Sequence, residues 1–106
     1  MNAFQILGDP VKRKILEMLV HSEHSAGEIV SNILSEFGIT QAAVSQHLKI
    51  LREAGFADVR KEGAKRIYIL DASPIKEIDN WIAPFMTYFE QHFHEPSIQP
   101  EHDAQA

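Results

Sequence analysis

The predicted fold depends chiefly on residues 40–55, TQAAVSQHLKILREAG. The apolar residues of this stretch recur at helical spacing: Val44, Leu48 and Leu51. We therefore expect a helix over residues 41–54 that buries one face and leaves a polar face exposed. Thr40 suits the capping position before the helix, and Gly55 suits its end.

A capped helix and a short turn precede this stretch. Ser25 and Glu28 have the spacing of a capping box, and Gly38 is placed to end the helix that they begin. The apolar stripe of that helix is Ile29, Val30, Ile33, Leu34 and Phe37. A helix, a turn of about three residues and an amphipathic helix, in that order, predict a helix-turn-helix.

Two further helices are expected at the N-terminal end. Residues 3–7 form a short one, and Asp9-Pro10 opens a longer one, with a cap followed by proline at the first helical position. The apolar residues of the longer helix are Val11, Ile15, Met18 and Leu19. We expect its other faces to carry Lys12, Arg13 and Lys14.

After Gly55 the pattern changes from helical to alternating. Residues 56–61 and 65–70 are rich in β-branched and aromatic side chains, and Glu62-Gly63-Ala64 lies between them. This pattern predicts a β-hairpin with glycine at its tip. The predicted fold is therefore mainly α, a winged helix-turn-helix of five helices and a two-stranded wing.

The fifth helix begins after Ser73-Pro74 and has an apolar stripe that resembles a coiled-coil seam. Pro84 falls inside it, so we expect a kink or a break near residues 80–83. A chain of 106 residues has little else to cover so apolar a helix, which favours a homodimer. The residues of this helix expected at the dimer interface are Ile78, Trp81, Ile82, Phe85 and Phe89. Residues 1–94 would form the DNA-binding and dimerisation domain, and residues 95–106 a flexible acidic tail.

The charge is unevenly distributed along the chain. The formal net charge is −5, yet residues 40–70 carry six basic and three acidic side chains. Residues 71–106 carry one basic and seven acidic side chains. A local basic patch contacts phosphates even when the whole chain is acidic, so the composition is compatible with duplex DNA as a partner.

The helix at 41–54 and the basic wing at 60–66 are the candidate DNA-binding elements. A major groove accommodates one helix, and glutamine and serine side chains near its start reach base edges there. Lys49 and Arg52 are better placed for phosphates, and the wing cations would lie along the backbone or in the minor groove. The candidate residues are Thr40, Gln41, Ala42, Ser45, Gln46, Lys49, Arg52, Arg60, Lys61, Lys65 and Arg66.

Four stretches together resemble one family of winged-helix repressors. They are residues 9–16, DPVKRKIL; residues 25–29, SAGEI; residues 43–56, AVSQHLKILREAGF; and residues 60–63, RKEG. They look like the ArsR family over about residues 3–93. The resemblance implies a dimeric repressor whose helix at 41–54 reads the major groove, with release by an inducer that is often a metal ion. It also implies that the first and last helices build the dimer, which adds Phe4 and Leu7 of the first helix to the expected interface.

The chain departs from the common ArsR pattern in three respects. About four extra residues lie between Glu28 and the turn, the chain has no cysteine, and Asp79 is not followed by the family's metal-binding histidine. The aromatic residues of the last helix are instead similar to the SdpR-like subgroup, which has no known metal site. We therefore expect no metal site and leave the small-molecule or metal inducer unassigned.

Several alternatives remain open at this level. A metal-responsive repressor would use histidines near the tail, His92 and His94, which converge only in extended chain. A winged-helix protein-interaction module without DNA binding is a second alternative. No nucleophile–base pair, glycine-rich phosphate loop or metal-carboxylate cluster is visible, so we expect no enzymatic activity and no cofactor. No apolar run has the length of a membrane span and no signal sequence is visible, which favours a cytoplasmic location and no membrane partner.

Overall fold

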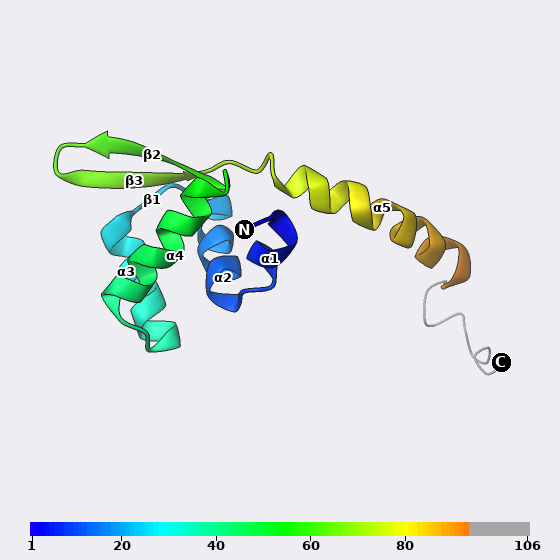
Figure 1. The fold of residues 1–106 in the computed structure, drawn as a ribbon, viewed down its shortest axis with the longest axis horizontal. Helices are drawn as coiled ribbons and strands as arrows, with labels where there is room; N and C mark the ends of the chain where they lie inside the picture. Colours follow the sequence, from blue (N-terminus) through cyan, green and yellow to red (C-terminus); the bar gives the residue numbers. More distant parts are fainter. Residues whose placement is uncertain (94–106) are drawn as a thin grey trace. The chain divides into compact units, whose positions relative to one another are not determined.

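A computed structural model describes residues 1–93 as five helices and a small antiparallel sheet (Figure 1). In chain order these are α1 (Ala3–Leu7), α2 (Pro10–His21), β1 (His24–Ser25), α3 (Ala26–Phe37), α4 (Gln41–Glu53), β2 (Ala57–Glu62), β3 (Lys65–Leu70) and α5 (Ile75–His92). The chain divides into two compact units, Met1–Lys76 and the segment that begins at Glu77, and each is described by itself. The predicted tail, 95–106, lies outside the described residues.

Local capping signals set the start of α2 and of α3. The Asp9 carboxylate accepts a hydrogen bond from the backbone N–H of Val11 at 2.9 Å, and Pro10 occupies the first helical position. At α3, the Ser25 hydroxyl accepts from the Glu28 N–H at 3.1 Å, and the Glu28 carboxylate accepts from the Ser25 N–H at 2.9 Å. This reciprocal pair is the predicted capping box.

The two helices of the helix-turn-helix, α3 and α4, are separated by the predicted turn of three residues. Gly38 ends α3 with φ of +68°, a left-handed conformation that glycine adopts without strain. Thr40 caps α4, because its hydroxyl accepts from the Ala43 N–H at 3.1 Å. Gly55, with φ of +84°, follows the end of α4. The predicted helix-turn-helix is therefore confirmed with its boundaries almost unchanged.

The core of the first unit forms around α2, which contacts α1, α3, α4 and β3. The largest fully buried side chains are Phe56, Ile6, Ile15, Ile29, Ile33, Leu51 and Val44. Every helix of this unit contributes at least one of them, so the apolar faces read from the sequence converge on one core.

The sheet has the order β1-β3-β2, with β3 in the middle. The hairpin of β2 and β3 is the predicted wing and projects beyond the helices of its unit (Figure 1). The third strand, β1, has only two residues and pairs His24 with Tyr68. The sequence did not indicate it, because two residues carry no periodic pattern.

The strand register assigns the wing's cations to opposite faces. Lys61 pairs with Arg66, whereas Arg60 pairs with Ile67. Directly paired residues share a face and successive residues alternate, so Lys61 and Arg66 lie on the face that carries Tyr68, and Arg60 lies on the other. The wing therefore presents two chemically different sides.

Two expectations differ from the structure. Lys12 was expected on a solvent face of α2, but its side chain is only 3% exposed. It lies on the same helical stripe as Ile15, Leu16 and Leu19, and so belongs to the buried side. Of the kink or break predicted near Pro84, the break does not occur, because α5 continues through that residue from Ile75 to His92. None of the helices within residues 1–93 is long and apolar enough to span a bilayer.

Candidate nucleic-acid interface

Helix α4 is anchored by one face and presents the other. Val44 and Leu51 are fully buried and Leu48 is nearly so. Every predicted contact residue on the helix and at its cap is exposed: Thr40, Gln41, Ala42, Ser45, Gln46, Lys49 and Arg52. The apolar stripe fixes the rotation of α4 about its axis, and this rotation turns the polar side chains outward.

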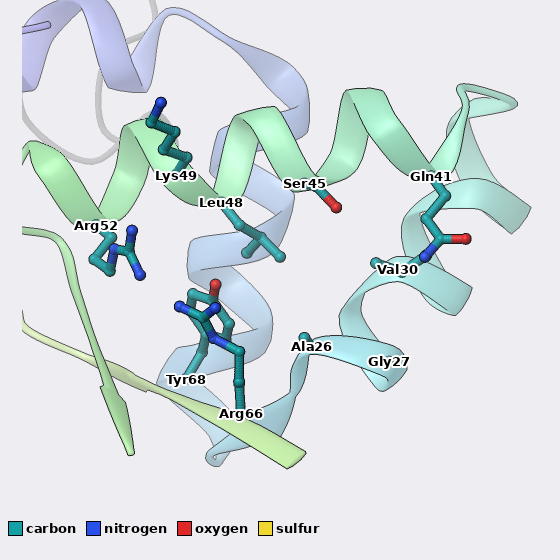
Figure 2. Close-up of a pocket in the computed structure, with 10 residues that line it drawn as sticks. All are labelled: Ala26, Gly27, Val30, Gln41, Ser45, Leu48, Lys49, Arg52, Arg66 and Tyr68. Atoms are coloured by element: carbon teal, nitrogen blue, oxygen red, sulfur yellow. The ribbon is translucent and has the colours of Figure 1, made fainter. Parts of the chain in front are cut away.

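A pocket of 520 Å³ lies between α4, the start of α3 and strand β3 (Figure 2). We call it the α3–wing pocket; its lining residues are Ala26, Gly27, Val30, Gln41, Ser45, Leu48, Lys49, Arg52, Arg66 and Tyr68. Three of them are cationic and none is acidic. The pocket therefore has the electrostatics of an anion-binding surface.

The structure brings some of the predicted residues together and separates others. Gln41, Ser45 and Arg52 share the α3–wing pocket with Arg66, although Arg66 comes from the wing. In Figure 2 the ammonium group of Lys49 extends away from the pocket. Six predicted residues do not line the pocket: Thr40, Ala42, Gln46, Arg60, Lys61 and Lys65.

Arg60 is held by two carboxylates on its own side of the wing. Its guanidinium lies 2.8 Å from Glu23 and 2.7 Å from Glu62. These hydrogen bonds raise the pKa of Arg60, and the hydrogen bond from Arg60 lowers the pKa of Glu23. The charge of Arg60 is thus already compensated within the chain. For Lys61, Lys65 and Arg66, the described part of the chain shows no ion pair.

A partly buried polar cluster joins α4 to the start of α2. The ammonium group of Lys12 lies 2.9 Å from the Asp9 carboxylate and 2.8 Å from Nδ1 of His47. His47 stands on α4 between the buried residues Val44 and Leu48, so it faces inward. Because Lys12 only donates, Nδ1 of His47 must accept, which makes the neutral imidazole the form that fits.

The pKa values of this cluster support that protonation state. Burial lowers the pKa of His47, the positive charge of Lys12 lowers it further, and the Asp9 carboxylate opposes both. Partial burial acts to raise the pKa of Asp9, but hydrogen bonds and charge from Lys12 hold it below its ordinary value. The cluster is therefore built for neutral His47 beside an ionised Asp9–Lys12 pair.

Sequence similarity assigns this arrangement to a family. A family model described as "Bacterial regulatory protein, arsR family" matches residues 9–59. The transcriptional repressor SdpR of Bacillus subtilis is 31% identical over 85 residues, which cover 80% of this chain and 90% of SdpR. The chain belongs to the arsR family of bacterial regulatory proteins. The resemblance inferred from the four sequence stretches is confirmed, including the similarity to SdpR.

Solved structures of arsR-type regulators share the fold. The crystal structure of Mycobacterium tuberculosis Rv0081 aligns with a TM-score of 0.60 at 26% identity, covering 86% of this chain and 89% of that one. The transcriptional repressor BigR from Xylella fastidiosa aligns with a TM-score of 0.56 at 29% identity, covering 77% and 81%. These family members are transcriptional regulators and not enzymes, as expected from the sequence.

Helix α5 presents an apolar surface in the single chain. Trp81 is 56% exposed and Phe85 is 54% exposed, and no residue of α5 is buried. The rings of Trp81 and Phe85 are tilted by 31° with centroids 4.5 Å apart, and those of Phe89 and Phe93 are tilted with centroids 5.2 Å apart. The other residues predicted at a dimer interface are exposed or half-buried: Phe4, Leu7, Ile78 and Ile82.

The histidine pair near the tail is only partly described. Nδ1 of His92 lies 2.8 Å from the Tyr88 carbonyl oxygen, and its ring stacks on that of Tyr88 at 3.9 Å. His94 lies outside the described residues. Within residues 1–93 no three His, Asp or Glu side chains are grouped closely enough to hold a metal ion.

Sequence reasoning missed Tyr68, which lines the α3–wing pocket, and Lys12, which is buried in the cluster that joins α4 to α2. Tyr68 lies two residues after Arg66 on β3. Because side chains alternate between the two faces of a strand, this spacing alone was enough to place both residues on one face. Lys12 lies three residues after the cap Asp9 and at helical spacing from Ile15 and Leu19. Its charge directed it to solvent in the prediction, because an unpaired buried lysine is rare.

Proposed function

We propose that this arsR-family chain is a cytoplasmic transcriptional repressor that binds duplex DNA as a homodimer. Helix α4 enters the major groove, with Gln41, Ser45 and Gln46 toward base edges. The observation that carries the proposal is the exposed polar face of α4, anchored by Val44, Leu48 and Leu51 and bordered by the cationic residues of the α3–wing pocket.

The remaining cations contact the DNA backbone. Lys49 and Arg52 extend from later turns of α4, and Lys61, Lys65 and Arg66 lie on the wing without an acidic partner in the described residues. Thr40 approaches a phosphate at the positive end of α4, and the small Ala42 permits close approach of the helix. Arg60 differs: its two carboxylate partners make it a positioning residue that holds the wing against the segment before β1.

Helix α5 pairs with its copy in a second chain. Six large apolar or aromatic side chains of this helix are exposed: Trp81, Ile82, Phe85, Met86, Tyr88 and Phe89. Exposed apolar side chains gathered on one element are typical of an interaction surface. A two-fold dimer would place two α4 helices about 34 Å apart, so the operator would be close to palindromic. No inducer is assigned, and the repressor role rests on similarity to SdpR and BigR.

The test is fluorescence anisotropy of the purified chain with a duplex from its own promoter and with a scrambled duplex, at ~150 mM salt. We expect tight binding to the promoter alone, with two subunits per site. Equal and weak binding to both duplexes would mean that the operator lies outside this promoter. No binding to either duplex at low salt would favour the protein-interaction alternative.

Two variants make the test specific to α4. Ser45→Ala and Gln46→Ala should each reduce the preference for the promoter by roughly 5–150-fold, which corresponds to about 1–3 kcal/mol for a lost base contact. Ser35→Ala is the matched control, because Ser35 is also exposed but lies on α3. Unchanged preference in both α4 variants would contradict the assignment of α4 to the major groove.

A further inference from the structure

The hydroxyl of Tyr68 has no hydrogen-bond partner in the described part of the chain, although Tyr68 is only 6% exposed. Its ring packs at the centre of the sheet, on the strand between β1 and β2. Figure 2 shows the hydroxyl directed toward α4, into the α3–wing pocket. The side chain is buried and its hydroxyl has no partner in the described residues, so the direction of the hydroxyl indicates where a ligand would accept its hydrogen bond.

The other walls of the pocket supply what an anion needs. The guanidinium groups of Arg66 and Arg52 border the pocket, and neither makes an ion pair within residues 1–93. The first turn of α3 contributes Ala26 and Gly27, whose backbone N–H groups lie at the positive end of a helix of twelve residues. The nearest carboxylate on that turn, Glu28, is folded back onto the Ser25 N–H at 2.9 Å.

Gly27 leaves room for a ligand to approach the backbone. A Cβ atom at this position would meet only the Ser25 hydroxyl oxygen, at 4.0 Å. The volume of the pocket, 520 Å³, greatly exceeds the roughly 30 Å³ that one water molecule occupies in the liquid. The pocket therefore accommodates a group much larger than a single water molecule.

We propose that the α3–wing pocket holds one backbone phosphate of the bound duplex, between the Tyr68 hydroxyl, the Arg66 guanidinium and the first-turn amides of α3. The inference rests on the proposed function and adds to it a specific phosphate position. This contact fixes the depth and register of α4 in the groove, because the pocket joins α3, α4 and the wing around a single group. Tyr68 contributes a hydrogen bond without charge, and Arg66 contributes charge.

The test begins with Tyr68→Phe, which removes only the hydroxyl oxygen and keeps the buried ring. We expect promoter binding to weaken by roughly tenfold per half-site, since a hydrogen bond to a charged group is lost. The slope of log affinity against log salt should stay unchanged, because no charge is removed. Arg66→Gln should instead reduce that slope by about one per subunit. Ser35→Ala is the control, because it removes an exposed hydroxyl on α3 that does not line the pocket.

A phosphate scan then separates direct contact from an indirect structural effect. Methylphosphonate is introduced at one phosphate at a time in the duplex that the wild-type chain binds. We expect one position per half-site at which the neutral linkage weakens wild-type binding strongly and weakens Tyr68→Phe binding little further. Arg66→Gln, which alters an exposed residue, provides the same comparison if Tyr68→Phe unfolds.

The outcomes distinguish this inference from the function on which it rests. If the wild-type chain binds no duplex, the proposed function fails. If the wild-type chain binds specifically and Tyr68→Phe binds equally well, the phosphate position is wrong while the function stands. Losses that add independently at every methylphosphonate position, in both variants, would also overturn the inference, because they exclude a shared contact.

Discussion

Helices α4 and α5 are both amphipathic, yet they use their apolar faces differently. On α4 the apolar residues are buried within the chain, and the exposed face is polar. On α5 no residue is buried, and the exposed face includes Trp81, Phe85 and Phe89. The same pattern in the sequence therefore leads to two different surfaces, one suited to a polar ligand and one to an apolar partner.

The difference teaches where each helix obtains its stability. Helix α4 packs on α2, α3 and β2, so its geometry is fixed by the unit to which it belongs. Helix α5 has eighteen residues and lacks the N–H that residue 84 would donate to the Asn80 carbonyl, because that residue is proline. We propose that α5 receives its packing from a second copy, which couples dimerisation to the order of this helix.

The largest expected effect concerns the buried apolar face of α4. Leu51→Ala should lower the free energy of unfolding by about 2–5 kcal/mol, because it leaves a cavity under α4. Urea denaturation followed by circular dichroism measures it. Val20→Ala, at an exposed position of α2, is the control and should change the free energy far less. Equal losses in the two variants would mean that Leu51 does not anchor α4.

The second prediction concerns α5, whose apolar face is exposed, and the quantity expected to change is the affinity between two chains. Phe85→Ala should raise the dimer dissociation constant by about 30-fold or more, the equivalent of about 2 kcal/mol for a central aromatic residue. Sedimentation velocity over a range of concentrations measures it, with Glu90→Gln on the same helix as the control. A wild-type chain that sediments as a monomer at micromolar concentration would contradict the role proposed for α5.

An apolar substitution in the polar cluster tests how that cluster holds α4. Lys12→Met keeps most of the buried aliphatic chain but removes the ammonium group that donates to the Asp9 carboxylate and to Nδ1 of His47. Because both partners are partly exposed, we expect a loss of about 1–3 kcal/mol of unfolding free energy, less than for a fully buried pair. The control is Lys14→Met, which removes a long surface pair with Glu36 at 3.6 Å. A stabilising effect of Lys12→Met would show that the cluster costs more than it contributes.

Much of the fold was predictable from the sequence because its signals are local. The caps at Asp9, Ser25 and Thr40 depend on residues within three positions, and a single chain displays them completely. Gly38 and Gly55 mark helix ends for an equally local reason. Strand β1 was not predictable, because it exists only through its pairing with β3.

The candidate site likewise has features that were predictable from the sequence and features that were not. The exposed face of α4 follows from helical periodicity, which needs no tertiary information. The α3–wing pocket does not, because it joins residues about forty positions apart, such as Gly27 and Arg66. The neutralisation of Arg60 is likewise a contact with Glu23 across 37 positions. Composition marked Arg60 as one of four equivalent wing cations, and only the strand register separates it from Arg66.

The smallest expected effect concerns the pH dependence that the cluster gives to α4. The folded chain lowers the pKa of His47 from 6.5, so the unfolded chain takes up the proton more readily. The contribution of neutral His47 to the free energy of unfolding is then fully present above about pH 6.5, and it is lost as the pH falls from there through the folded pKa. The lowered pKa of Asp9 adds a separate loss below about pH 3.8, when its carboxylate is protonated.

His47→Asn distinguishes these two pH windows. Its amide oxygen replaces Nδ1 as the acceptor for Lys12 but does not titrate. We expect urea denaturation of the variant to lose the part of the slope that begins near pH 6.5 and to keep the loss at lower pH. Direct titration of His47 by NMR in the wild-type chain provides the check. If the pKa of His47 in the folded chain is at or above 6.5, the Asp9 carboxylate has a larger effect on that pKa than burial and Lys12 together. Protonation of His47 would then stabilise the packing of α4 at acidic pH.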